Sequence, residues 1–265
     1  MGADIKSLRS RIKSVDSTLH LTKAMGLVAS SKIRRATENM QKSRVYAQAV
    51  ERALSLLTAA PECAKSPYMR QDGERTRLLV IAGDRGLAGG YNANIFRLVR
   101  EYPDAQLIPV GKRARDRYEG DFYSSEHFTG RDADALSRQL CADFAAGEFD
   151  RLGIVYTRFV SMMSQEADVR WVLPLTKGES TAHSVLFEPD ELTILATAVP
   201  EYVTGQIMAA VKESFCSEVV ARRMAMDSAG KNAQQMIDDL QLAYNRARQG
   251  SITQEITEIV AGAGS

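Results

Sequence analysis

The chain has 265 residues, 45% of them hydrophobic and 25% charged, which is ordinary for a soluble protein of one or two domains. It has no run of about eighteen apolar residues and no apolar core behind Met1, so we expect neither a membrane span nor a secretory leader. Three dispersed cysteines and three scattered histidines indicate a reduced compartment and predict no metal site and no cofactor.

The net charge of +1 conceals an asymmetry between the two ends of the chain. Residues 1–58 hold 11 basic and 4 acidic side chains, whereas residues 201–260 hold 6 and 8. A basic segment facing an acidic one favours antiparallel pairing and leaves positive charge for an acidic partner. We do not expect nucleic-acid binding by base stacking, because Tyr46 is the only aromatic residue of the first segment.

The first segment, from about Asp4 to Thr58, predicts one long helix, because the first proline is Pro61. Its apolar residues recur every three or four positions, as along the seam of a coiled coil. The seam starts with large side chains and continues with smaller ones: Ile5, Leu8, Ile12, Val15 and Leu19, then Thr22, Ala29, Ile33, Ala36 and Met40.

The middle of the chain predicts a small α/β sheet, largely parallel at its start. Short apolar runs alternate there with helical stretches, and residues 169–175 alternate like an edge strand that ends near Pro174. The expected buried strands are 78–82, 107–110 and 153–157, and the expected helices are 92–101 and 132–146.

A glycine-rich turn, residues 83–90, follows the first expected strand and precedes a helix, as phosphate-binding loops do. It matches neither GxGxxG nor a Walker A loop, so we interpret it as a structural turn with close backbone packing. The residues assigned to this turn are Gly83, Asp84, Arg85, Gly86, Gly89 and Gly90.

The last segment, from about Tyr202 to Val260, predicts a second long helix, because Pro200 is the final proline. Its expected seam again steps by three and four, through Met226, Ala229, Ala233, Met236, Leu240, Ala243 and Ala247. The predicted divisions are therefore an N-terminal coiled-coil helix (1–60), a central α/β domain of Rossmann-like type (61–200) and a C-terminal helix (201–265) that packs on the first.

Three blocks resemble the gamma subunits of F-type ATP synthases, and the resemblance covers nearly the whole chain. They are residues 21–25 together with 28–32, the turn GDRGLAGGYN at 83–92, and the highly specific block YNRARQGSITQEITEIVAGA at 244–263. The resemblance implies a non-catalytic rotor shaft whose two terminal helices form a long antiparallel coiled coil inside a ring of alpha and beta subunits. It also implies a foot bound to the epsilon subunit and the c-subunit ring, on the cytoplasmic face of a bacterial membrane, coupling proton or sodium flow to ATP synthesis.

The resemblance further implies contacts with the beta subunits. Arg248, Gln249 and Thr253 match positions that hydrogen-bond to acidic beta loops. Met25 and Arg222 match the region of the shaft that meets an acidic lever of beta. Lys23 and Lys32 add to the basic surface of the shaft in that region.

Two further groups are implied at the ends of the shaft. Ile256, Ile259 and Val260 match the tip that turns inside an apolar collar. Phe187 and Glu188 match a segment near the c ring, where the family has Tyr in place of Phe187, so any contact of a tyrosine hydroxyl is lost or replaced.

Two other interpretations stay open from the sequence. One is a nucleotide-binding enzyme with coiled-coil arms, which binding of ATP or a dinucleotide by the isolated chain would favour. The other is a static coiled-coil scaffold, which would still support activity when cross-linked to its partners.

Overall fold

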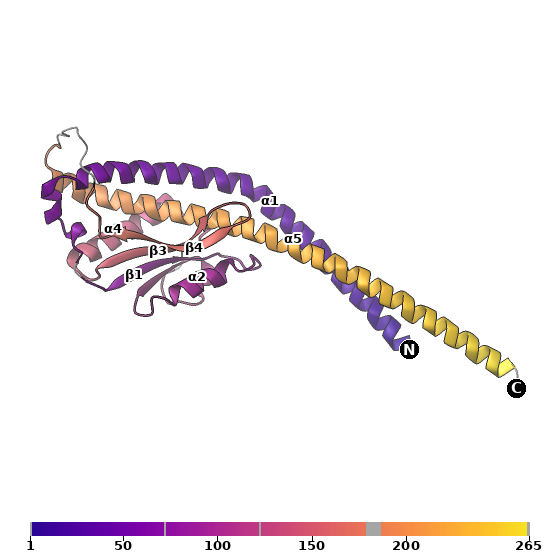
Figure 1. The fold of residues 1–265 in the computed structure, drawn as a ribbon. Coiled ribbons are helices and arrows are strands. Elements are labelled where there is room, and N and C mark those ends of the chain that lie inside the picture. Colours follow the sequence, from indigo (N-terminus) through magenta and orange to yellow (C-terminus); the bar gives the residue numbers. More distant parts are fainter. Residues whose placement is uncertain (1, 72, 122, 179–186, 264–265) are drawn as a thin grey trace. The chain divides into compact units, whose positions relative to one another are not determined.

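The computed structural model describes residues 2–71, 73–121, 123–178 and 187–263 (Figure 1). Two helices account for about half of the chain, α1 (Gly2–Thr58) and α5 (Glu191–Ala263). The chain divides into two compact units, one made of residues 32–221 and one made of residues 1–31 and 222–265. The three-part division expected from the sequence stays a prediction.

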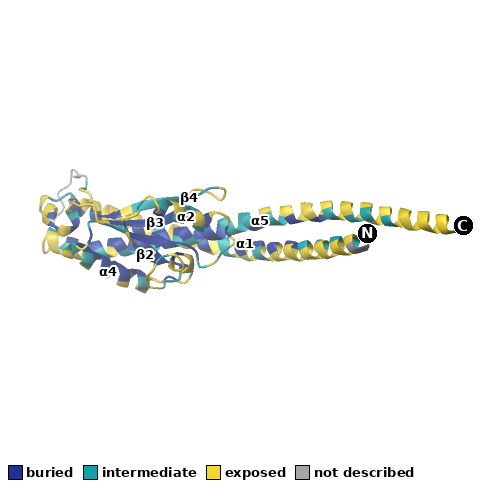
Figure 2. Cartoon of the chain, turned by 90° about the horizontal axis from the view of Figure 1, so that it is seen from below, coloured by how far each residue is buried: buried dark blue, intermediate teal, exposed yellow. Residues whose placement is uncertain are grey.

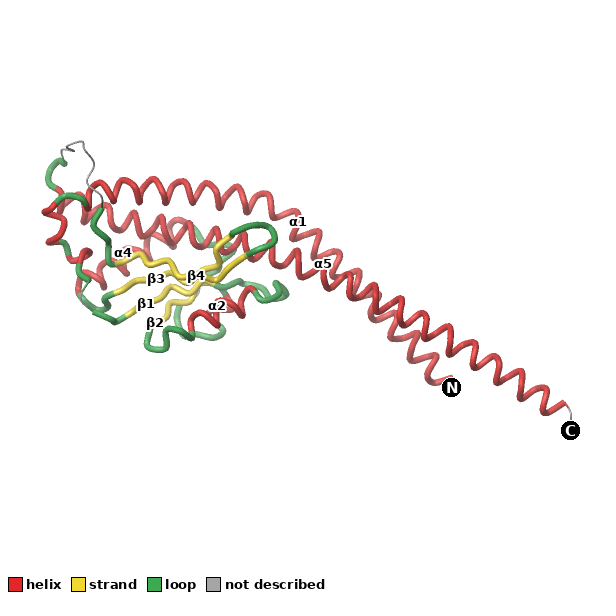
Figure 3. The backbone as a smooth tube through the Cα atoms, in the orientation of Figure 1, coloured by secondary structure: helices red, strands yellow, loops and turns green. Residues whose placement is uncertain are grey.

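The larger unit contains a four-stranded sheet in the order β2-β1-β3-β4 (Figure 3). Strand β1 (Thr76–Ile81) pairs in parallel with β2 (Gln106–Val110) and with β3 (Arg151–Phe159). The last strand, β4 (Gln165–Leu173), pairs antiparallel with β3 and forms an edge of the sheet. The expected α/β sheet, parallel at its start and with a final edge strand, is confirmed, and the antiparallel pairing of β4 makes it a mixed sheet.

Short helices connect these strands. Two 3-10 helices, Pro61–Lys65 and Pro67–Met69, lead from α1 to β1. Helix α2 (Tyr91–Val99) joins β1 to β2, and α3 (Lys112–Arg115) and α4 (Gly130–Ala146) follow β2. Thr129 and Asp132 form a capping box at the start of α4, which satisfies amides that the first helical turn leaves unpaired.

The core of the larger unit lies where the sheet, α4 and parts of both long helices meet, and Figure 2 shows this buried interior. Leu54 and Leu57 of α1 pack in the same apolar cluster as Ile154 of β3 and Ile207 of α5. The three cysteines, Cys63, Cys141 and Cys216, are buried and free, so they pack as small apolar side chains.

Helix α5 begins earlier than the sequence predicts, because Pro200 lies inside the helix and does not precede it. A proline in a helix interior removes one hydrogen bond and costs about 3 kcal/mol. Leu195, Val199 and Val203, on both sides of Pro200, are fully buried in the core. Their burial offsets the cost of the proline, so tertiary packing decides where the helix starts.

The smaller unit is an antiparallel pair formed by the first part of α1 and the last part of α5. Gly26 lies close to Met226, whereas Leu19 packs with Ala233 and Ile237. Earlier residues of α1 therefore contact later residues of α5, as in an antiparallel pair. On α1 the predicted seam is confirmed, because all its positions from Ile5 to Met40 are buried or half-buried.

On α5 part of the predicted seam is wrong. Met236 is 46% exposed, while its neighbour Ile237 is 5% exposed and packs on Leu19. Ala243 is likewise exposed and Tyr244 is half-buried. Residues 236 and 237 lie about 100° apart around the helix, so a seam through either residue fits a repeat of three and four. Packing against α1 selects the seam that passes through Ile237.

Within the described residues, one stretch of α5 is long and apolar enough to cross a membrane by length and composition alone. More than half of that stretch is buried within the protein. The apolar residues therefore serve the core of the larger unit and the helix pair.

Candidate functional site

The end of α5 carries a run of exposed side chains. Ser251 is half-buried, and every residue from 252 to 262 is exposed (Figure 2). Ile256, Ile259 and Val260 are 56%, 70% and 67% exposed. Aliphatic side chains in this state expose apolar surface that burial against a partner would stabilise by about 25 cal/mol per Å².

The polar residues assigned to the same helix end are exposed too. Arg248, Gln249 and Thr253 lie within two turns, and the Thr253 hydroxyl donates to the Gln249 carbonyl at 2.9 Å. Within the described residues, the side chains of Arg248 and Gln249 make no ion pair or hydrogen bond. Their donors are therefore available to a partner.

Further along the helix pair, Lys23 is exposed and lines a groove of about 470 Å³ between the two helices. Met25 and Arg222 are half-buried in the same unit. Lys32 belongs to the larger unit, where its ammonium group lies 2.5 Å from the Glu126 carboxylate. The charge of Lys32 is thus already paired within the chain.

Glu126 also forms an ion pair with Arg85 of the glycine-rich turn, with 3.4 Å between Arg85 Nη2 and Glu126 Oε2. Burial alone would raise the pKa of Glu126, but the hydrogen bond and charge of Lys32, with the charge of Arg85, lower it below its usual range. The turn is therefore connected to α1 by one shared carboxylate.

Asp84 links the turn to neighbouring segments through hydrogen bonds. Its carboxylate accepts hydrogen bonds from the Ser124 hydroxyl at 2.6 Å and from the backbone amides of Lys112, Ser125 and Glu126 at 2.9–3.2 Å. Burial would raise the pKa of Asp84, but these four hydrogen bonds outweigh it and lower the pKa. The turn thereby holds α3 and the segment after residue 122 in place.

The close packing around Gly83 explains why the start of this turn needs a glycine. A Cβ atom at this position would lie 2.7 Å from the buried carboxyl group of Glu218 on α5. The Gly83 amide donates to the side chain of Asn92 at 2.9 Å. A buried acidic group beside the turn disfavours phosphate binding, which the nucleotide-binding interpretation requires.

Residues Phe187 and Glu188 precede α5. Phe187 is half-buried against the core of the larger unit and Glu188 is exposed, whereas the adjacent Leu186 lies outside the described residues. Asp190 then caps α5 by accepting from the Thr193 amide and hydroxyl at 2.9 and 2.8 Å. The structure thus places the predicted residues in four separate regions: the end of α5, the helix pair, the turn and the segment before α5.

The sequence did not single out Glu213, a buried carboxylate on α5. It accepts from Arg44 of α1 and from the backbone amide of Phe159. A lone Glu in an amphipathic segment gives no signal of burial, and Arg44 is separated from it by 169 positions.

Comparison with known proteins agrees with this arrangement. A family model described as ATP synthase matches residues 4–265. The ATP synthase gamma chain of Ruminococcus albus is 37% identical, over 97% of this chain and 96% of that one. The sodium-ion-specific gamma chain of Acetobacterium woodii is 36% identical, over 99% of each chain.

The chain belongs to the ATP synthase gamma-chain family. It is accordingly a non-catalytic rotor subunit of a membrane-associated synthase and not one of the catalytic subunits. A chain of the rotor of the Euglena gracilis mitochondrial ATP synthase has a TM-score of 0.68 at 18% identity, covering 95% of this chain and 100% of that one. This likeness confirms the expected fold class, an antiparallel coiled coil with a small α/β domain.

Proposed function

We propose that the exposed end of α5 turns inside a ring of three alpha and three beta subunits and sets the state of each catalytic beta subunit in turn. Membership of the gamma-chain family is the observation that carries this proposal. Rotation can bias a beta subunit only through contacts whose free energy differs between its states. The exposed aliphatic and polar side chains at the end of α5 are available for such contacts.

The aliphatic residues Ile256, Ile259 and Val260 would form a bearing in an apolar collar. Such contacts are non-directional, so they hold the axis without fixing its angle. Arg248, Gln249 and Thr253 would form a catch with acidic beta loops. Charge-assisted hydrogen bonds contribute about 1.5–3 kcal/mol, which is enough to time a step and still allow the bond to break.

The larger unit would form the foot, which binds an epsilon subunit and the c ring, with Phe187 and Glu188 on the side of the ring. The complex would lie on the cytoplasmic face of a bacterial membrane. Support comes from the bacterial sources of the related gamma chains.

The first experiment assembles the matching alpha and beta subunits with and without this chain and measures ATP hydrolysis. We expect a stable complex with one copy of the chain and a large rise in turnover. If no complex forms and turnover does not change, the rotor proposal is wrong, and binding of ATP by the isolated chain becomes the next measurement. A complex that stays active after the chain is cross-linked to beta would instead favour a static scaffold.

The catch is tested by the double variant Arg248→Ala with Gln249→Ala in the assembled synthase. We expect about a tenfold loss of ATP synthesis, equivalent to ~1.4 kcal/mol, at unchanged helicity of the isolated chain. Gln235→Ala is a matched control, because Gln235 is exposed on the same helix and its side chain donates to Asp239 one turn further along that helix. Synthesis and hydrolysis at the parent rates would show that the catch is assigned to the wrong residues.

A further inference from the structure

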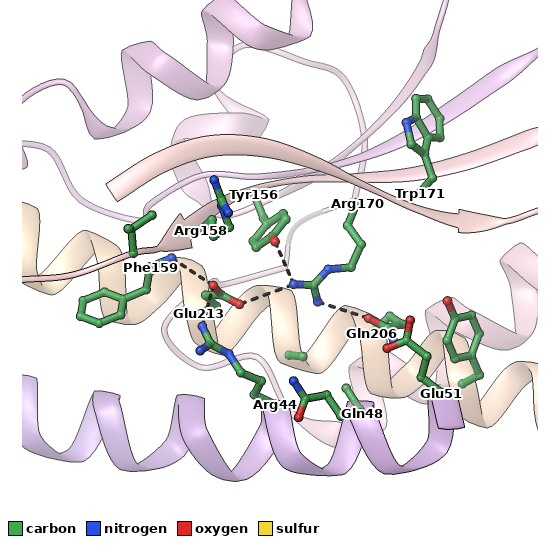
Figure 4. A pocket seen from close by; sticks show the side chains of 14 residues that line it. Arg44, Gln48, Glu51, Tyr156, Arg158, Phe159, Arg170, Trp171, Gln206 and Glu213 are labelled. Carbon is green, nitrogen blue, oxygen red and sulfur yellow. Dashed lines mark hydrogen bonds and ion pairs between the residues drawn. The ribbon is translucent and has the colours of Figure 1, made fainter. Parts of the chain in front are cut away.

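One buried carboxylate connects four elements of the larger unit (Figure 4). Glu213 of α5 is 3% exposed, and its Oε1 accepts from Arg44 Nη2 of α1 at 2.9 Å and from the Phe159 amide of β3 at 3.0 Å. Its Oε2 lies 3.6 Å from Arg170 Nη2 of β4. Helices α1 and α5 and both strands of the hairpin therefore converge on Glu213.

Arg170 extends these contacts along the same cleft, which has a volume of about 460 Å³. Its guanidinium donates to the Tyr156 hydroxyl at 2.8 Å and to the Gln206 side chain at 3.2 Å, and it stacks over the Tyr156 ring. Gln206 and Glu213 both lie on α5, so Arg170 joins β4 to α5 at two positions. The planar guanidinium fixes the direction of each of these bonds.

The end of β3 shows why α5 must supply polar groups here. Pairing between β1 and β3 ends at Val155, so among the described residues no strand pairs with the later residues of β3 on that side. Side chains of α5 take its place: Ser214 Oγ accepts from the Thr157 amide at 2.9 Å, and Ser217 Oγ donates to the Thr157 carbonyl at 3.2 Å. Together with the bond from Phe159 to Glu213, they satisfy backbone groups that would otherwise be buried and unpaired.

Directional bonds of this kind restrict motion that apolar packing permits. Apolar attraction has no preferred direction, so by itself it fixes the orientation of a helix on the sheet less tightly. Separating the buried carboxylate of Glu213 from its partners, in contrast, leaves an uncompensated charge inside the protein. The contacts of Glu213 therefore set the rotational position of both helices relative to the sheet of this unit.

We propose that Glu213 is a positioning residue that makes the joint between the sheet and the two long helices torsionally stiff. This inference rests on the proposed rotor function, since stiffness matters only if torque passes between the sheet and the helices. The joint consists of Glu213, Arg44, Arg170 and the backbone of Phe159. The residue acts through these partners and touches no substrate.

The experiment uses the assembled synthase with a bead attached to a cysteine introduced at exposed Arg100. The native cysteines of this chain are buried, so labelling within the chain is selective for Arg100→Cys. With the alpha–beta ring fixed and rotation stalled, the variance of the bead angle measures torsional stiffness. We expect Glu213→Ala and Glu213→Gln to increase this variance at least twofold, while hydrolysis without load stays near the parent rate.

Glu51→Gln is the matched control, because Glu51 lines the same cleft and makes no ion pair within the described residues. Unchanged variance in assembled complexes of both Glu213 variants would overturn the proposal. If Glu213→Ala does not fold, Glu213→Gln, which retains an acceptor for the Phe159 amide, still decides. A parent chain that fails to assemble would overturn the rotor function separately.

A second readout, on the isolated chain, does not depend on rotation. Hydrogen exchange at the Phe159 amide should become at least tenfold faster in Glu213→Ala, with the exchange of β1 amides unchanged. Equal exchange in parent and variant would show that Glu213 does not hold this strand.

Discussion

The carboxylate of Asp84 accepts four hydrogen bonds, and its pKa is lower in the folded chain than in the unfolded one. The resulting stabilisation is present above the unfolded pKa of about 3.9 and is lost as the pH falls through that value toward the folded pKa. Asp84→Asn should therefore lower the free energy of unfolding by about 1–3 kcal/mol at pH 7 and flatten its pH dependence below about pH 5.

Urea unfolding between pH 3 and pH 7 measures this effect. Asp104→Asn serves as the control, because Asp104 is exposed. If Asp84→Asn and the control have the same pH profile, the carboxylate does not stabilise the fold as we infer.

Gly83 gives a second prediction at the scale of single residues. Gly83→Ala places a Cβ 2.7 Å from the Glu218 carboxyl group, which has little room to move because it is buried. We expect a loss of about 1–3 kcal/mol in the free energy of unfolding. Gly90→Ala should change it far less, because a Cβ there meets only Asn94 at 3.6 Å or more. Equal melting temperatures for the two variants would contradict this reading of the turn.

At the scale of elements, the side of α5 that faces α1 is decided by Ile237. Ile237→Ala removes a buried side chain that packs on Leu19 and should cost about 2–4 kcal/mol, whereas Met236→Ala should cost less than about 1 kcal/mol. Hydrogen exchange of amides in the helix pair measures local stability directly. Faster exchange in Met236→Ala than in Ile237→Ala would support the phase that the sequence predicts.

The helices and strands follow from local sequence pattern, but two of their details do not. Helix α1 ends at Thr58 as the position of Pro61 predicts, and the α1 seam is buried where the repeat places it. The start of α5 and its phase at Ile237 were missed. Both depend on distant partners, the core around Leu195 in one case and Leu19 in the other.

At the scale of the whole molecule, the end of α5 contributes little to the stability of the isolated chain. All of its residues from 252 to 262 are exposed. Removal of residues 252–265 should therefore leave the melting temperature of the isolated chain within about 2 °C of the parent, because the residues of this segment whose burial is described are all exposed. The same truncation should weaken assembly with alpha and beta subunits. A large fall in the melting temperature would mean that this segment packs within the chain.

The sequence by itself determined the two long helices, the α/β sheet with its parallel start and the family, because periodicity, prolines and a specific C-terminal block are local properties of the chain. It also indicated the turn at Gly83, since several glycines directly after a strand are typical of a tight turn with close backbone packing. Only the tertiary structure decided that Glu213, Arg44 and Arg170 meet, that Asp84 gathers amides from two segments, and that Lys32 is already paired. The reason is physical: burial and pairing of a charge depend on residues brought together by folding, which spacing along the chain does not encode.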